Sequence, residues 1–328
     1  MFFIEGRKQF YMINNPKIKA LTYLHISVFL WGFTAIFGKL ISYDSFTLVW
    51  HRMTLTAAVY FLFPKVWKQL FKLNRKEIFR FLGIGAIVCA HWLTFYGSIK
   101  VGNSVSITLA CLGSSSFFAS IFEPLLLKQE FQKRDIISGL VVILGVAFIS
   151  FSLPEPPDKT ASYAPAISIG ITSAALAALF STLNKKYIDN APPLTISALE
   201  MLSGAFLLGI VALITFPEAF SVIPNWSIQL YDPNNLQNGS LDLLWLILLS
   251  VLCTNLTFYL ATIALKQISA FTANLSVNLE PVYGIILGIW IFKENQDLNA
   301  SFYLGTLIIL AAIFINVFIK EKVLEDDR

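Results

Sequence analysis

Apolar stretches of about 20 residues, the length of a membrane-spanning helix, recur along the chain between short polar connections. Lipid offers the backbone no hydrogen-bond partners, so such stretches are predicted to be helices. Charged residues make up only 13% of the 328 residues, about half their usual share in soluble domains. We therefore predict an all-α integral membrane protein.

The apolar pattern predicts ten transmembrane helices, with residues 1–20 and 321–328 as cytoplasmic segments at the two ends. Prolines such as Pro64 and Pro154 stand at proposed helix ends, where they punctuate helices. The predicted spans are 21–39, 46–63, 78–98, 104–126, 136–152, 166–184, 194–215, 242–264, 271–292 and 302–320.

Lys and Arg residues concentrate in the connections on one side of this arrangement. With the N-terminus inside, only Lys39, Lys100, Lys159 and Lys293 of the 24 fall in outer segments. Cytoplasmic connections retain an excess of Lys and Arg. Both termini are therefore predicted to be cytoplasmic, in a multi-pass protein for which a bacterial inner membrane is the expected location.

An internal repeat relates the two halves of the chain. The segment GLVVILGVAFI from Gly139 aligns without gaps with GTLIILAAIFI from Gly305. Five spans in each half mean that the second half enters the membrane from the opposite side. Residues 21–152 and 166–320 are thus predicted to be two inverted five-helix repeats, joined by an outer linker at 153–165.

Several doubled features resemble a known transporter family. Residues Trp31 to Lys39 read WGFTAIFGK, and Arg52 lies near the start of the second span. The fourth and ninth spans are followed by KQE and KEN, and each then leads to a glycine-led last helix. Over nearly the whole chain this resembles the drug/metabolite transporter (DMT) superfamily, specifically its EamA-type permeases. The resemblance implies a ten-helix fold, a central cavity and carrier-type movement of small metabolites.

The fourth span departs from the pattern of that family. EamA-type proteins commonly carry a proline in the middle of this span, whereas this chain has Ser114, Ser115 and Ser116, with Pro124 later. The hinge behaviour of the two halves is therefore expected to differ.

Ionisable side chains inside predicted spans are the first candidates for a substrate or coupling site, since each costs at least about 2.5 kcal/mol at the bilayer centre. Glu280 ranks first because it lies near the middle of the ninth span, before Pro281, whose missing amide frees a carbonyl. Asn274 and Asn278 add hydrogen-bonding groups. We expect Glu280 to bind substrate or a proton; the alternative is a carboxylate that only ties helices together.

Arg52 and Glu200 take repeat-related places in the second and seventh spans. A guanidinium group suits a carboxylate or phosphate ligand, and in the empty carrier Arg52 is expected to pair with Glu280. A purely structural cation is an equally open interpretation of Arg52. For Glu200 the favoured interpretation is a side chain that reaches the inner interface.

One histidine and three aromatic residues complete the candidate site. His91 is able to relay protons near neutral pH, although a lone histidine is more often a packing residue. Trp31, Tyr96 and Tyr259 are candidates for the wall of a cavity, although aromatic residues in spans more often pack or anchor the helix at the interface.

No metal-ligand spacing and no nucleotide-binding motif occurs in the sequence, so no metal, cofactor or nucleic-acid partner is predicted. The predicted function is a secondary transporter that exports or exchanges a small organic metabolite, such as an amino acid, by alternating access in the lipid bilayer. Proton coupling and the oligomeric state stay open. The alternatives are a sugar-phosphate or nucleotide-sugar carrier and, less favoured, a channel or an intramembrane enzyme acting on lipid.

Overall fold

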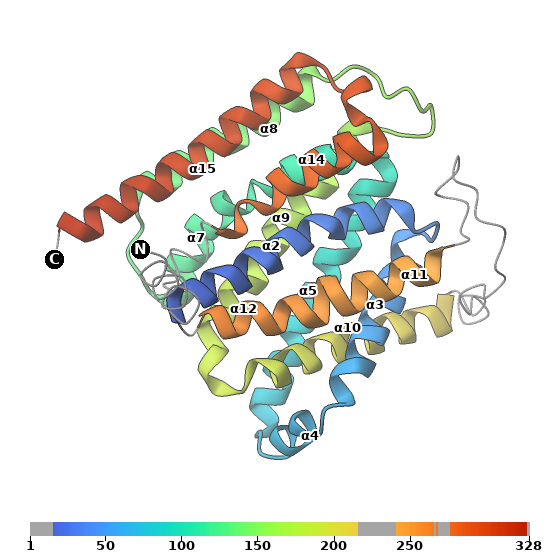
Figure 1. Cartoon of the computed structure of the whole chain (residues 1–328), viewed down its shortest axis with the longest axis vertical. Helices are drawn as coiled ribbons and strands as arrows, with labels where there is room; N and C mark the ends of the chain where they lie inside the picture. Colours follow the sequence, from blue (N-terminus) through green and yellow to red (C-terminus); the bar gives the residue numbers. More distant parts are fainter. Residues whose placement is uncertain (1–15, 216–240, 266, 268–275, 327–328) are drawn as a thin grey trace, which may run out of the picture.

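A computed structural model describes residues 16–215, 241–265, 267 and 276–326, and in these residues it is helical without strands (Figure 1). Two single-turn 3-10 helices, Ile188–Asn190 and Glu294–Gln296, lie between longer elements. The other helices are α2 Pro16–Leu40, α3 Ser45–Phe61, α4 Pro64–Leu70, α5 Arg75–Gly102, α6 Val105–Leu112, α7 Ser115–Leu127, α8 Lys133–Ser152, α9 Tyr163–Tyr187, α10 Pro193–Thr215, α11 Asp242–Ile247, the π-helix η3 Leu248–Leu256, α12 Thr257–Leu265, α14 Glu280–Phe292 and α15 Ala300–Asp326.

The lengths and hydropathies of the described helices are those of a multi-pass membrane protein. Seven helical segments are long and apolar enough to cross a bilayer, and the bent pair α3 and α4, at 89° to each other, allows an eighth. Two shorter apolar helices lie at Glu280–Phe292 and Ala300–Asn316. Each expected span thus has a helical counterpart, but the number of ten crossings does not follow from length and hydropathy alone.

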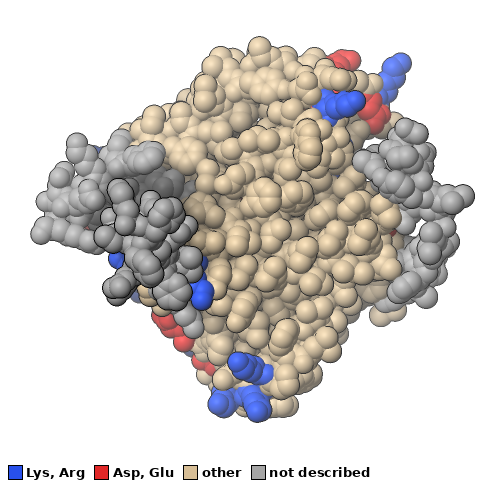
Figure 2. Space-filling view, viewed as in Figure 1, with Lys and Arg blue, Asp and Glu red and all other residues tan. Residues whose placement is uncertain are grey.

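The outer surface fits a lipid environment. Figure 2 shows that the face seen in this view carries almost no charged side chains across its centre, and that Lys, Arg, Asp and Glu gather at its margins. Many large apolar side chains are exposed on the helices, for example Leu144, Phe206 and Trp290 at 67%, 66% and 78%. In water such a surface would be an aggregation hazard, whereas lipid solvates it.

Contacts between helices of the two halves come in equivalent pairs: when one helix of the first half packs on one of the second, their repeat-related helices also pack together. Helix α5 packs on α9 as α12 packs on α2, and α7 packs on α9 as α14 packs on α2. Helix α10 packs on α5 as α3 packs on η3, whereas α3 with α10 and α8 with α15 join equivalent helices of the two halves. The packing therefore has the pattern of a two-fold repeat.

Helices α8 and α15 lie side by side and run in opposite directions (Figure 1). The Ser138 hydroxyl donates to the Ala312 carbonyl at 2.8 Å near one end, and Asn299 donates to the Ser152 carbonyl at the other. Between them a Cβ added at Gly145 would lie 3.4 Å from the Gly305 carbonyl oxygen. The aligned glycine-containing segments of the two repeats thus meet where small residues let helices approach closely.

The fourth and ninth expected spans are interrupted at equivalent places. Gly113 and Ser114 separate α6 from α7, and a turn at Asn278 precedes α14, which begins at Glu280. When the two halves are aligned so that Gly139 matches Gly305, Ser114 matches Glu280. The ninth span is therefore not the continuous helix that was predicted.

Serine hydroxyl groups accompany the interruption of the fourth span. Ser114 Oγ donates to the Cys111 carbonyl at 2.6 Å, and Ser116 Oγ donates to the Gly113 carbonyl at 3.0 Å. Such side-chain bonds compete with the helical hydrogen bonds and bend helices. The serines thus mark the same kind of break at which the second half carries Pro281.

Candidate functional site

Arg52 is the centre of a buried polar cluster between α3, α5 and η3. Its side chain is only 2% exposed. Nε and Nη2 donate to Thr254 Oγ1 at 3.2 and 2.9 Å, and Nη1 donates to the Tyr96 hydroxyl at 2.5 Å. The guanidinium group lies over the Trp92 ring, 3.6 Å from its centroid. Neutral groups therefore fix the position of the guanidinium group without neutralising its charge.

The expected ion pair between Arg52 and Glu280 is absent. Among the described residues no carboxylate oxygen lies within 4.0 Å of the Arg52 nitrogens. A guanidinium group has five N–H groups, and Tyr96 and Thr254 use three. The prediction was wrong because it counted only charged partners, whereas hydroxyl oxygens and an aromatic face also stabilise a guanidinium group. The other two N–H groups have no acceptor among the described residues.

Glu280 is the first residue of α14, where it is partly buried. Its carboxylate makes no hydrogen bond with the described residues, although it is among the charges that act on Arg52. The N-terminus of a helix carries partial positive charge and favours an anion. Asn278 is partly buried in the preceding turn. Asn274 lies outside the described residues.

The η3–α12 segment connects two of the candidate residues. Thr254 receives the Arg52 hydrogen bonds and donates to the Leu249 carbonyl at 2.9 Å, which fixes its hydroxyl. Three residues on, the Thr257 hydroxyl accepts from Trp31 Nε1 at 2.8 Å. Because π-helical segments are frequent at functional sites, the π-helix η3 is a structural reason to consider a site here.

The other candidates within the described residues make no hydrogen bond with the Arg52 cluster. His91 bonds through Nδ1 to the Ser173 carbonyl of α9 at 2.9 Å, as a satisfied packing histidine does. Tyr259 is 53% exposed on α12. Glu200, in α10, is only 1% exposed. Its side chain therefore does not reach the surface, contrary to the interpretation favoured from the sequence.

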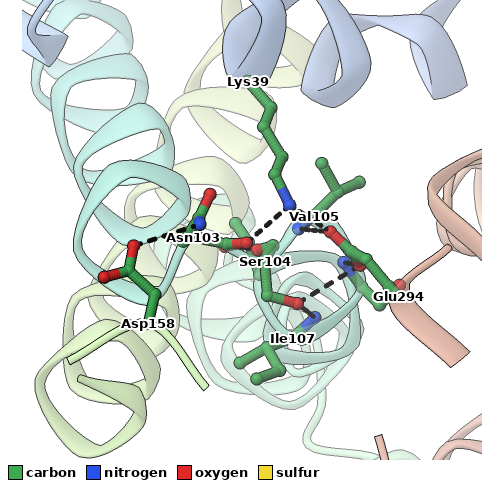
Figure 3. A network of polar contacts seen from close by, with 9 residues as sticks. Lys39, Asn103, Ser104, Val105, Ile107, Asp158 and Glu294 are labelled. Carbon is green, nitrogen blue, oxygen red and sulfur yellow. Dashed lines mark hydrogen bonds and ion pairs between the residues drawn. The ribbon is translucent and has the colours of Figure 1, made fainter. Parts of the chain in front are cut away.

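A second polar network, not predicted from the sequence, joins α2, α6 and the turn after α14 (Figure 3). Glu294 Oε1 accepts from Lys39 Nζ at 2.9 Å and from the Val105 amide at 2.8 Å, and Oε2 accepts from the Ser106 amide at 2.9 Å. Lys39 also donates to the Asn103 carbonyl at 2.6 Å. The carboxylate thus caps the N-terminus of α6.

The charge of Glu294 is stabilised by these contacts. Burial alone would raise the pKa of its carboxyl group, but the Lys39 ammonium group and the amides of α6 outweigh burial and lower this pKa below its ordinary value. In the repeat-related position, Lys185 pairs instead with Glu123 at 3.0 Å, and both side chains are partly exposed. The two repeat-related lysines therefore form ion pairs that differ in burial.

The family of the chain follows from its doubled match to one family model. The model of the EamA-like transporter family matches residues 18–151 and again residues 164–318. The chain belongs to this family. An EamA-like transporter of the DMT type is a multi-pass membrane protein, in agreement with the apolar helices.

One solved structure, described as "Crystal structure of protein", resembles this EamA-like transporter with a TM-score of 0.61. The match covers 93% of this chain and 98% of the other at 13% sequence identity, and so concerns the fold alone. No curated protein sequence matches the chain.

Sequence reasoning missed Thr254, Lys39 and Glu294 in this EamA-like transporter. Threonine is common in apolar spans, and nothing in its sequence neighbourhood marks Thr254 as a partner of Arg52. A usable signal did exist for the other two, because Lys39 ends WGFTAIFGK and Glu294 is the acid of KEN. Both motifs served to recognise the family and carried no assigned role.

Proposed function

We propose that the chain is a secondary transporter that exports or exchanges a small zwitterionic metabolite, such as an amino acid, across a bacterial inner membrane. Ten helices in two inverted five-helix repeats would expose a central site alternately to the two sides. Family membership supports a transporter rather than an enzyme. Substrate class, direction and mechanism are the parts that the proposal adds.

The observation that carries the proposal is the separation of two opposite charges in one buried region. Arg52 and Glu280 act on each other electrostatically, but the Arg52 nitrogens and the Glu280 carboxylate oxygens are more than 4.0 Å apart. An α-amino acid presents a carboxylate and an ammonium group a short distance apart. In this proposal the carboxylate binds the two remaining N–H groups of Arg52, and the ammonium group binds Glu280.

The interrupted spans support alternating access. Discontinuous helices in repeat-related positions occur at the substrate sites of many secondary transporters, where half-helix ends face the ligand. In this chain one such end, the N-terminus of α14, carries Glu280. Movement at the Ser114 and Asn278 breaks would therefore move a site residue directly.

Transport in proteoliposomes tests the proposal. Purified protein is reconstituted, loaded with unlabelled amino acids, and assayed for counterflow of labelled ones, with and without a pH gradient. An Arg52→Ala variant should lower uptake of the transported amino acid by about ten- to a hundred-fold, as expected for loss of about 1.5–3 kcal/mol of charged hydrogen bonding. Uptake of the same amino acid with its carboxylate amidated should change little.

Arg80→Ala is the matched control, because Arg80 lies over the Tyr187 ring at 4.0 Å and takes no part in the Arg52 cluster. Equal losses for the acid and its amide would give Arg52 a structural role only. If sugar phosphates or nucleotide sugars exchange and amino acids do not, the substrate class is anionic and the proposal of a zwitterionic substrate is wrong.

A further inference from the structure

A second group of buried polar atoms lies around Glu200, apart from the Arg52 site. Its carboxylate Oε1 is buried, and no described residue donates a hydrogen bond to it. Four more buried oxygen atoms on neighbouring helices are likewise without a hydrogen-bond partner in the described part of the chain. They are Thr56 Oγ1 and the Tyr60 hydroxyl on α3, Asn184 Oδ1 on α9 and Asn255 Oδ1 on η3. Native interiors leave few such atoms unpaired.

The contacts bring these oxygen atoms into one region. Thr56 and Tyr60 lie one turn apart on the same face of α3. Asn255 Nδ2 donates to the Thr56 carbonyl at 3.2 Å, and the Tyr60 hydroxyl lies beside the side chains of Asn255, Ser197 and Glu200. On the other side Asn184 lies beside Glu200. These side chains are close enough for Asn184 to act on Glu200 and for Ser197 and Asn255 to act on Tyr60. Among the described residues, however, the five oxygen atoms have no partner with good hydrogen-bond geometry.

No cation balances a negative charge on Glu200. In the described part of the chain no Lys, Arg or His nitrogen lies within 4.0 Å of its carboxylate. An isolated buried carboxylate is disfavoured strongly enough to take up a proton or a positive ion.

The cations on the elements packed around Glu200 have other partners or are exposed. Tyr60 on α3 and Asn184 on α9 lie beside the carboxylate, and Gly85 on α5 packs against the Glu200 backbone. Arg52 on α3 bonds to Tyr96 and Thr254, Arg80 on α5 lies over the Tyr187 ring, and α12 carries no charged residue. The remaining amines on α4 and α9 are the exposed Lys65 and Lys68, Lys185, which pairs with Glu123, and the exposed Lys186.

We propose that Glu200, Tyr60 and Asn255 form a binding site for one small monovalent cation, H⁺ or Na⁺, which is the coupling ion of the transporter. A proton would bind covalently to a Glu200 oxygen, whereas Na⁺ would take the carboxylate, hydroxyl and amide oxygens as ligands, the type that hard cations prefer. This inference rests on the proposed function, since coupling requires a carrier. It assigns the cation to Glu200 and leaves Glu280 to the substrate.

Two elements connect this site to the substrate site. Arg52, Thr56 and Tyr60 follow one another at intervals of four residues and so share one face of α3. On the π-helix η3, Thr254 binds Arg52 and the next residue, Asn255, binds the Thr56 carbonyl. A shift of α3 against η3 changes both sites, so each ligand is able to bias the same equilibrium.

Direct cation binding to purified protein tests the inference without any transported metabolite. Thermal unfolding in detergent is recorded while NaCl replaces choline chloride at constant ionic strength, and infrared spectra record the carbonyl band of protonated carboxyl groups across a pH series. The variants are Glu200→Gln and Tyr60→Phe, with Glu155→Gln as the control for an exposed carboxylate.

For Na⁺, the wild type and the control should gain several degrees in Tm in a saturable way, as ligand linkage requires, and Glu200→Gln should gain none. For H⁺, Na⁺ should have no effect, and one protonated-carboxyl band that titrates in the wild type should be missing in Glu200→Gln. Tyr60→Phe should weaken the Na⁺ response or shift the titration of the band.

A Glu200→Gln protein with the same Na⁺ response and the same infrared bands as the wild type would overturn the inference. That outcome would leave the proposed carrier intact, because counterflow of substrate needs no coupling ion. Failure of the wild type to exchange any substrate would instead count against the proposed function.

Discussion

At the scale of residues, the WGFTAIFGK motif makes contacts in both the Arg52 cluster and the Glu294 network. Trp31 bonds to Thr257 of α12, and Lys39 bonds to Glu294. Gly38 makes room for Tyr96, since a Cβ at this position would lie 2.2 Å from the Tyr96 ring. Because the Tyr96 hydroxyl accepts from Arg52, a glycine of the first span helps to set the position of a guanidinium group on the second.

A Glu280→Gln variant tests the role given to the second charge of the site. Gln keeps the size of the side chain but cannot pair with an ammonium group, so uptake of a zwitterionic amino acid should fall by about ten-fold or more, the effect of one lost charged hydrogen bond. Uptake of the analogue in which hydrogen replaces the amino group should fall much less. Counterflow in proteoliposomes measures both, and equal losses for the two substrates would contradict the assignment.

At the scale of elements, the half-helix α6 depends on a residue from the other repeat. The amides of Val105 and Ser106 at its N-terminus have no acceptor within the helix. Glu294, which follows α14, supplies both acceptors while it pairs with Lys39 of α2. One carboxylate thus ties together three elements at one end of the molecule.

A Glu294→Gln variant should destabilise the protein by about 1.5–3 kcal/mol at neutral pH, because hydrogen bonds to a charged group are lost. Since the folded-state pKa of Glu294 lies below the ordinary value of 4.5, its stabilising effect is fully present above that value and is lost as the pH falls through the lower pKa. The Tm difference from the wild type should therefore be large at neutral pH and shrink in acid. Thermal unfolding of detergent-purified protein over a pH series measures it.

Glu155→Gln is the control for this experiment, because Glu155 is an exposed carboxylate in the connection between α8 and α9. It should leave Tm unchanged at every pH. A Glu294→Gln protein as stable as the wild type at neutral pH would show that the network contributes nothing to the fold.

At the scale of the whole molecule, the sequence predicted what depends on hydropathy and not what depends on tertiary contact. The positions of the helices follow from apolar runs because a lipid-exposed backbone must satisfy its own hydrogen bonds. The break before Glu280 and the π-helix η3 leave the apolar runs continuous, so no hydropathy pattern reveals them. Arg52 and Glu280 stood out as charges in apolar spans, whereas the neutral partners of Arg52 were not identifiable.

The connections between helices are expected to lie on defined sides of the membrane. In Figure 1 the start of α2 and the end of α15 lie at one end of the molecule and the connection between α8 and α9 lies at the other. The segment around α4 is rich in Lys and Arg, which cytoplasmic connections retain. With the three native cysteines buried, a membrane-impermeant thiol reagent on intact cells should label Lys159→Cys. Lys72→Cys should be labelled only after permeabilisation, since it belongs to the basic segment. Labelling of Lys72→Cys from outside would reverse the orientation or change the number of crossings before it.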